Sequence, residues 1–179
     1  MQETVVLTMK GICKAFPGVQ ALDHVDLEIR AGEVMALVGE NGAGKSTLMK
    51  ILAGTYTLDE GAIYLSGEQV HIKNPRHARD LGVSVIYQEL NLAEHISVAE
   101  NIFAGREFKT KLGLIDYGKL YKEAQKWLDT LHITGVNPRD EIRNLSIAKK
   151  QMVEIAKAIS LDSNIIVMDE PTSSLPTAT

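Results

Sequence analysis

The sequence predicts an α/β fold in which a largely parallel sheet is covered by helices. Two continuous apolar runs, at residues 34–38 and 165–168, have the length and composition of buried strands. A glycine-rich turn follows the first run and opens a helix whose apolar residues, among them Leu48 and Ile51, recur at helical spacing. Strand, loop and helix in this order are typical of α/β proteins, and 179 residues suit one domain.

Further elements follow from the periodicity of apolar residues. Residues 5–9 and 25–29 alternate, or nearly alternate, apolar with polar side chains, which predicts half-buried strands in an antiparallel edge layer. Residues 61–65 and 83–87 predict two more strands, and residues 75–81 predict a short helix that begins at a proline.

The pattern becomes helical over residues 89–145. Ser97 and Glu100 have the spacing of a capping box, so a helix should begin there. A second helix is indicated by one apolar stripe at steps of three and four: Leu120, Ala124, Trp127, Leu128 and Leu131. A third is expected from about residue 146 to 159, with these residues facing inward: Met152, Val153, Ile155, Ala156 and Ile159.

Composition excludes several classes of function. The net charge of −4 and the pI near 5.7 argue against nucleic acid as a partner, because duplex binding needs clustered Lys and Arg. Cys13 is the only cysteine, so an internal disulfide and a cluster of cysteine ligands are excluded. No window reaches the roughly 18 apolar residues of a membrane span, so any membrane contact should be made through a partner.

Residues 39–46, Gly-Glu-Asn-Gly-Ala-Gly-Lys-Ser, fit the P-loop pattern and stand where its mechanism requires, after an apolar run and before a helix. Glycine allows the backbone amides to turn toward a phosphate, and the helix N-terminus adds partial positive charge. Lys45 is expected at the β- and γ-phosphates and Ser46 on Mg²⁺. The predicted nucleotide-binding residues of this segment are Gly39, Glu40, Asn41, Gly42, Ala43, Gly44, Lys45, Ser46 and Thr47.

Two acidic residues follow the second apolar run. Asp169 is predicted to hold Mg²⁺ through water, and Glu170 is predicted to polarise the water that attacks the γ-phosphate. With Lys45, these residues predict a site for ATP and Mg²⁺. We expect residues 1–88 to form the nucleotide-binding core, residues 89–159 a helical subdomain, and residues 160–179 the return to the core.

The order of these motifs resembles the nucleotide-binding domain of ABC transporters over essentially the whole chain. Four sequence segments are similar to the first ATPase half of monosaccharide importers of the ribose and galactose type: YQELNL, ISVAENIFAGRE, KQMVEIAKA and MDEPTSSL. The resemblance implies ATP hydrolysis coupled to sugar import, with two nucleotides held between paired ATPase domains. It also implies that membrane permease subunits are partners and that a sugar-binding protein is a partner indirectly. The implied location is cytoplasmic, on the inner face of the membrane.

The resemblance assigns three further residues. Phe16 matches the aromatic residue that stacks on adenine, although a core residue ahead of the turn at Pro17 is the alternative. Gln88 matches the catalytic glutamine that senses Mg²⁺ and the γ-phosphate. Ser146 matches the signature serine that contacts the γ-phosphate of the opposing subunit, but Ile147 and Ala148 replace the family's two glycines, so we expect a weakened contact.

The C-terminal end departs further from the family. Beyond the segment at residues 173–175 the family continues into a helix, a parallel strand and a switch histidine, so we expect a truncated end and a gap in the central sheet. A nucleotide-binding fragment that does not hydrolyse ATP is therefore one alternative. An ABC ATPase of translation or DNA repair is another, although residues 89–145 lack the sustained heptads of the coiled coil in repair proteins.

Overall fold

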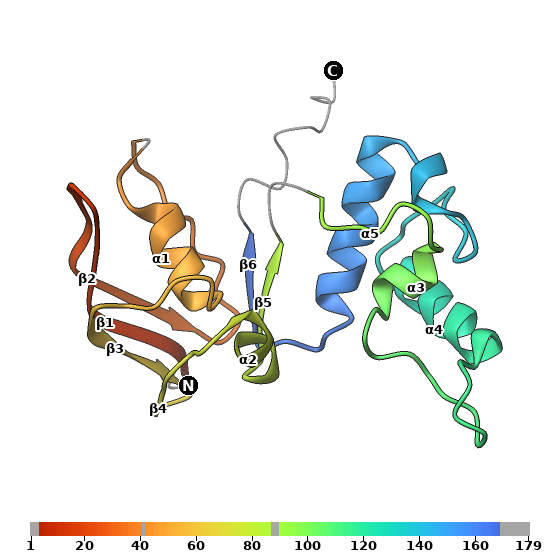
Figure 1. Cartoon of the computed structure of the whole chain (residues 1–179), viewed down its shortest axis with the longest axis horizontal. Coiled ribbons are helices and arrows are strands. Elements are labelled where there is room, and N and C mark those ends of the chain that lie inside the picture. Colours follow the sequence, from red (N-terminus) through yellow and green to blue (C-terminus); the bar gives the residue numbers. More distant parts are fainter. Residues whose placement is uncertain (1–3, 41, 87–89, 169–179) are drawn as a thin grey trace. The chain divides into compact units, whose positions relative to one another are not determined.

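The computed structural model describes residues 4–40, 42–86 and 90–168, and the chain divides into two compact units. The first unit is Met1–Ser84 and the second is Val85–Thr179. Figure 1 shows the strands of the first unit in red to yellow and the helices of the second in green to blue. The domain boundaries expected from the sequence, after residues 88 and 159, rest on motifs, whereas these units are defined by compactness. The boundaries expected from the sequence therefore stay a prediction.

The first unit is built on a four-stranded antiparallel sheet in the order β2-β1-β3-β4. The strands are β1 (Val5–Phe16), β2 (Val19–Arg30), β3 (Glu60–Leu65) and β4 (Glu68–Val70). β1 and β2 form a hairpin that turns at Pro17 and Gly18, where a φ of 80° at Gly18 suits glycine. The antiparallel layer is confirmed, although its first two strands are longer than the alternating segments that predicted them.

Two helices belong to this unit, α1 (Lys45–Leu52) and α2 (Pro75–Asp80). Leu48, Ile51 and Leu52 of α1 are buried, as their spacing predicts. α2 begins where Asn74 accepts a hydrogen bond from the backbone N–H of His77, with proline at the first helical position. The core of the sheet comes mainly from β1, which buries Leu7, Met9 and Ile12.

The prediction of a covered strand at residues 34–38 is wrong for this structure. The segment forms no strand, and the exposed fractions of Val34 and Val38 are 98% and 90%. An apolar run becomes a covered strand only when neighbours pair with its backbone and other layers shield its faces. Among the described residues, neither sheet provides a strand that pairs with this segment.

The second apolar run does form a strand, β6 (Ile165–Met168), which pairs with β5 (Val83–Ile86) in a two-stranded sheet. Figure 1 shows the two arrows pointing the same way. Ile165 and Val167 are buried, whereas Met168 is 53% exposed. β6 is therefore covered on one face, and the described part of the predicted parallel sheet consists of these two strands.

The second unit is helical, with α3 (Val98–Ile102), α4 (Tyr117–Thr130), a 3₁₀ turn at Ile142–Asn144 and α5 (Ile147–Ile159). Figure 1 shows the three α-helices grouped together. They enclose one core made of Val98, Ala99, Ile102, Phe103, Leu120, Ala124, Leu128, Val136, Ile142, Val153 and Ala156. The apolar stripe predicted for α4 is thus confirmed. On α5, Val153 and Ala156 are buried as expected, but so are Gln151 and Glu154.

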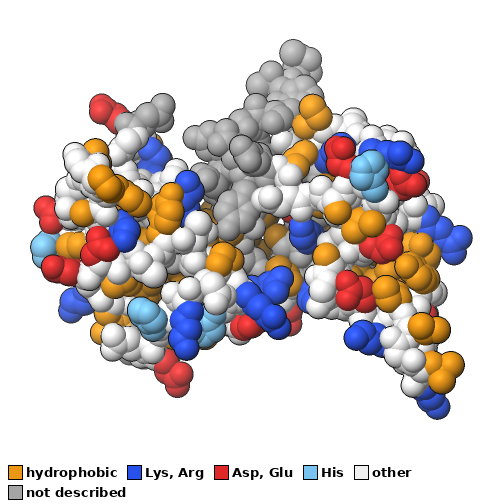
Figure 2. Space-filling model, in the orientation of Figure 1, with side chains coloured by type: hydrophobic (Ala, Val, Ile, Leu, Met, Phe, Trp, Pro, Cys, Tyr) orange, Lys and Arg blue, Asp and Glu red, His pale blue; other side chains and the backbone are white. Residues whose placement is uncertain are grey.

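The predicted capping box at α3 is confirmed. The Ser97 hydroxyl accepts from the backbone N–H of Glu100 at 3.2 Å, and the Glu100 carboxylate accepts from the backbone N–H of Ser97 at 2.9 Å. A loop between α3 and α4 exposes Leu112 and Leu114, and Figure 2 shows hydrophobic and basic side chains together on this loop. No helix within the described residues is long and apolar enough to cross a membrane.

Candidate functional site

The loop that precedes α1 has a backbone that depends on glycine at two positions. Gly42 and Gly44 have φ values of 89° and 84°, in the left-handed region that L side chains rarely adopt. Between them, the backbone N–H of Ala43 donates to the carbonyl oxygen of Glu40 at 3.1 Å and tightens the turn. The chain therefore reaches α1 through a compact loop, as the P-loop pattern predicts.

Gly44 also packs closely against the sheet. It is the N-cap of α1, and its carbonyl accepts from the backbone N–H of Leu48 at 2.9 Å. A Cβ atom at this position would lie 2.5 Å from the carbonyl oxygen of Ala21 on β2. The absence of a side chain thus lets the start of α1 sit directly against the β1–β2 hairpin.

Lys45 folds back over the loop. Its Nζ donates to the carbonyl oxygen of Gly39 at 2.6 Å and to that of Glu40 at 2.8 Å. The ammonium group therefore lies at the start of the loop. There, hydrogen bonds to phosphate oxygens can replace its bonds to the two carbonyl oxygens. Charge-assisted bonds of this kind are stronger than bonds between neutral groups.

The first turn of α1 offers further groups for an anion and a cation. Ser46 is exposed and Thr47 is half-buried. The first turn of this helix, which the structure describes in full, carries no acidic residue that would offset the positive end of the helix. The exposed hydroxyl of Ser46 is an oxygen donor of the type that Mg²⁺ accepts, so the described residues fit a phosphate with its magnesium ion.

Phe16 lies at the turn of the β1–β2 hairpin, in the same unit as the loop. Its ring is half-buried and meets the ring of Tyr56 edge to face, with centroids 5.2 Å apart and an interplanar angle of 67°. Nζ of Lys14 lies 5.7 Å from the centroid of Phe16. The ring therefore has an aromatic and a cationic neighbour, an arrangement compatible with stacking of a base and with a packing role.

The sequence reasoning missed the residue that fixes the strand before Phe16. Asp59 accepts from Nζ of Lys14 at 2.6 Å and from the backbone N–H of Ala15 at 2.8 Å. These bonds hold the pKa of Asp59 below its usual value, with the Lys14 bond as the larger cause. An acidic residue just before β3 is too common in loops to be recognised from sequence, so only the strand register reveals this role.

Ser146 lies in the second unit as the N-cap of α5. Its hydroxyl accepts from the backbone N–H of Lys149 at 3.4 Å, and the side chain is exposed. Ile147 is 61% exposed, so an isoleucine side chain projects where the family has glycine. Nζ of Lys149 donates to the carbonyl oxygen of Gly135 at 2.6 Å, which ties this helix start to the preceding loop.

Four of the residues expected from the sequence lie outside the described residues: Asn41, Gln88, Asp169 and Glu170. The strands that precede three of them, β5 and β6, are hydrogen-bonded neighbours. Phe16 and the described residues of the loop at residues 39–47 belong to the first unit. Ser146 belongs to the second unit, and its site role stays a prediction.

A glycine-dependent loop that opens a helix, with a lysine held over it, defines a nucleotide-binding cassette of the P-loop class. The family profile described as "ABC transporter" matches residues 22–173, and the chain belongs to that family. A solved ATP-binding cassette of an ABC transporter, MJ1267 in its ADP conformation, has a TM-score of 0.78 and 27% identity over 96% of this chain and 71% of its own. A nucleotide-free cassette matches equally well, over 95% and 70%. The expected fold class is thereby confirmed.

Curated relatives are ATP-binding proteins of sugar importers. A protein of Burkholderia lata named for ribose, galactose and methyl galactoside import is 51% identical over 170 residues, which is 95% of this chain and 32% of the relative. A xylose import ATP-binding protein of Geobacillus kaustophilus is 48% identical over 97% of this chain and 34% of its own length. The chain thus spans about a third of the length of these relatives.

Proposed function

We propose that this chain binds ATP with Mg²⁺ and serves as an ATP-hydrolysing domain of a monosaccharide importer. The observation that carries the proposal is the loop before α1, where Gly42 and Gly44 adopt left-handed backbones and Lys45 lies over the loop. The importer assignment rests on identities of about half to sugar-import ATP-binding proteins. Ribose, galactose and xylose appear in the names of those relatives, so a monosaccharide is the proposed cargo.

In the proposed complex, the phosphates lie on the backbone amides of the loop, between Gly39 and Thr47. Lys45 releases the carbonyl oxygens of Gly39 and Glu40 and bonds to the β- and γ-phosphate oxygens instead. Phe16 stacks on the adenine from the hairpin turn. This placement is supported because the hairpin that carries Phe16 also contacts Gly44 through Ala21.

Magnesium would be held by Ser46, Gln88 and Asp169, three side chains with oxygen donors. When bound, the ion neutralises charge on the β- and γ-phosphates. Gln88 and Asp169 follow two strands that pair with one another, β5 and β6. Figure 1 shows both strands pointing the same way, so β5 and β6 end at the same edge of their sheet, which supports a shared site.

For hydrolysis, Glu170 accepts a proton from a water molecule as the water oxygen attacks the γ-phosphorus. The bond from this phosphorus to the β-phosphate oxygen breaks, and ADP and phosphate leave. Ser146 contributes its hydroxyl to the γ-phosphate of an opposing domain. The exposed side chain of Ile147 beside it favours a weaker contact at this trans site than glycine would allow.

The partners proposed for the chain are a second ATPase domain, membrane permease subunits and, indirectly, a sugar-binding protein. These partners place it on the cytoplasmic face of the membrane. The support is the import function named for the two relatives.

Replacement of Lys45 by alanine tests the nucleotide site. Loss of the charged bonds to phosphate should cost about 1.5–3 kcal/mol, which weakens ATP binding about 10- to 100-fold. The measurement is a calorimetric titration of the chain with Mg-ATP. Lys10→Ala is the matched control, because Lys10 is an exposed lysine of the same unit on β1. Equal affinity of the parent and Lys45→Ala would reject the phosphate site.

Replacement of Glu170 by glutamine separates binding from chemistry. The amide keeps the shape of the side chain but accepts no proton, so ATP affinity should persist while phosphate release falls to background. Release is measured at high chain concentration, where two copies can pair. Turnover of Glu170→Gln at the parent rate would show that another group serves as the base.

A further inference from the structure

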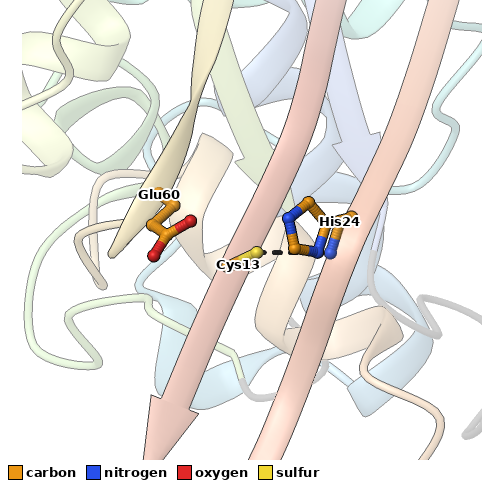
Figure 3. Close-up of side chains that lie close together, drawn as sticks. All are labelled: Cys13, His24 and Glu60. Carbon is orange, nitrogen blue, oxygen red and sulfur yellow. Dashed lines mark hydrogen bonds between the residues drawn. The ribbon is translucent and has the colours of Figure 1, made fainter.

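Three side chains with different metal-binding atoms lie together on the sheet of the first unit. Cys13 on β1, His24 on β2 and Glu60 at the start of β3 place a sulfur, a ring nitrogen and a carboxylate oxygen within 4.8 Å of one another. Figure 3 shows them in a row across three neighbouring strands. Cys13 and Glu60 are register partners in the β1–β3 pair, so the sheet itself holds two of the three in place.

The backbone at His24 brings the third side chain into the group. His24 lies where the β1–β2 register is irregular and has a φ of 47°, in the left-handed region. Its backbone N–H donates to Sγ of Cys13 at 3.3 Å. This conformation is uncommon for residues other than glycine, although histidine, asparagine and aspartate adopt it more often than the rest, and such positions gather at functional sites.

A carboxylate also orients the imidazole of His24. Nδ1 lies 2.7 Å from Oδ1 of Asp23, which leaves Nε2 as the nitrogen for a metal ion. Metal-binding histidines commonly have this arrangement, in which the second ring nitrogen is bonded to a carboxylate that fixes the tautomer and the ring direction. Cys13 is 6% exposed, whereas His24 and Glu60 are exposed, so the two side chains that can shift to close around an ion lie at the surface.

We propose that Cys13, His24 and Glu60 form a binding site for Zn²⁺, with water as the fourth ligand. Thiolate, imidazole and carboxylate together suit a borderline-soft ion that accepts tetrahedral geometry, whereas Mg²⁺ and Ca²⁺ prefer oxygen ligands. A single cysteine excludes a cluster of cysteine ligands, but one thiolate is enough in a mixed site. The Mg²⁺ proposed with the nucleotide uses none of these three residues.

The ion would join β1, β2 and β3 by side-chain bonds in addition to their backbone hydrogen bonds. Phe16 follows Cys13 by three residues on β1, and Ala21, which contacts Gly44, precedes His24 by three residues on β2. Zinc would therefore restrain the hairpin that supports the glycine-rich loop. This consequence depends on the sheet alone and does not require the chain to hydrolyse ATP.

The test is a titration of the untagged chain with Zn²⁺ in the absence of nucleotide, in competition with a chromophoric chelator and under a reductant that is not a thiol. We expect one equivalent to bind and the melting temperature to rise. Co²⁺ in place of Zn²⁺ should give a thiolate-to-cobalt charge-transfer absorption, which identifies Cys13 as a ligand. His24→Asn and Glu60→Gln should each remove the tight equivalent, and Asp23→Asn should weaken it about 10- to 100-fold.

His132→Asn is the matched control for His24→Asn. His132 is also an exposed histidine with a left-handed backbone, at a φ of 54°, but it lies in the second unit. Asparagine tolerates this backbone, so both variants should fold. Unchanged zinc affinity in His24→Asn, or equal losses in His24→Asn and His132→Asn, would overturn the proposal. Absence of the charge-transfer absorption with Co²⁺ would overturn it as well, even if zinc binds elsewhere.

Discussion

Replacement of Gly44 by alanine should damage the nucleotide site by two separable effects. The first is conformational, because a left-handed backbone costs a residue with a Cβ atom about 1–2 kcal/mol. The second is steric, since the new Cβ would lie 2.5 Å from the carbonyl oxygen of Ala21 and 2.8 Å from a methyl group of Leu22. The leucine can rotate, but the carbonyl belongs to the backbone of β2, so α1 must shift away from the sheet. Overpacking of this kind costs about 1–3 kcal/mol.

Gly42→Ala isolates the conformational effect. Gly42 has a φ of 89°, close to that of Gly44, but among the described residues a Cβ there would meet nothing within 4 Å. We therefore expect Gly42→Ala to lower the free energy of unfolding by about 1–2 kcal/mol and Gly44→Ala by about 2–5 kcal/mol.

Urea denaturation of the two variants and the parent, followed by a Mg-ATP titration, measures the difference. Gly44→Ala should also lose more ATP affinity, because a shift of α1 moves Lys45 together with the amides of the loop. Equal destabilisation by the two variants would refute the reasoning, since it would mean that the contact between Gly44 and β2 does not constrain the loop.

Three further predictions follow from other contacts. Phe16→Leu should weaken ATP binding by about 1–3 kcal/mol, while calorimetry should show an unchanged affinity for inorganic tripolyphosphate, which has no base. Equal losses of affinity for both ligands would indicate that Phe16 packs against Tyr56 instead of stacking on the base. Ser97→Ala should lower the free energy of unfolding by about 0.5–2 kcal/mol in urea denaturation, and no change would mean that the capping box does not stabilise α3. The Ser97 hydroxyl is the main cause that lowers the pKa of Glu100. This carboxylate should therefore stabilise the fold above its unfolded pKa of about 4.3 and lose that effect as pH falls through the folded pKa, so melting curves of Ser97→Ala should show a smaller loss between pH 7 and pH 3.

The elements that the sequence predicted correctly are those whose signals are local. The capping box at Ser97 needs only four residues, and the stripe on α4 needs one face of one helix. Residues 34–38 failed because a covered strand depends on partners elsewhere in the chain, and apolar composition alone cannot supply them. Tertiary contacts also decided what the sequence could not show, such as the bonds of Asp59 behind Phe16 and the group of ligand atoms around Cys13.

The position of Lys45 changes how its replacement should be interpreted. Nζ donates to two carbonyl oxygens of the loop in this structure, so the side chain orders the loop before any phosphate arrives. Phosphate binding exchanges these bonds for bonds to the ligand, and the net gain is the difference between the two sets. Lys45→Ala removes both sets, which leaves the carbonyls to water and the loop less ordered. The measured loss of affinity therefore contains the cost of ordering that loop, and Lys45 contributes both to the shape of the site and to its charge.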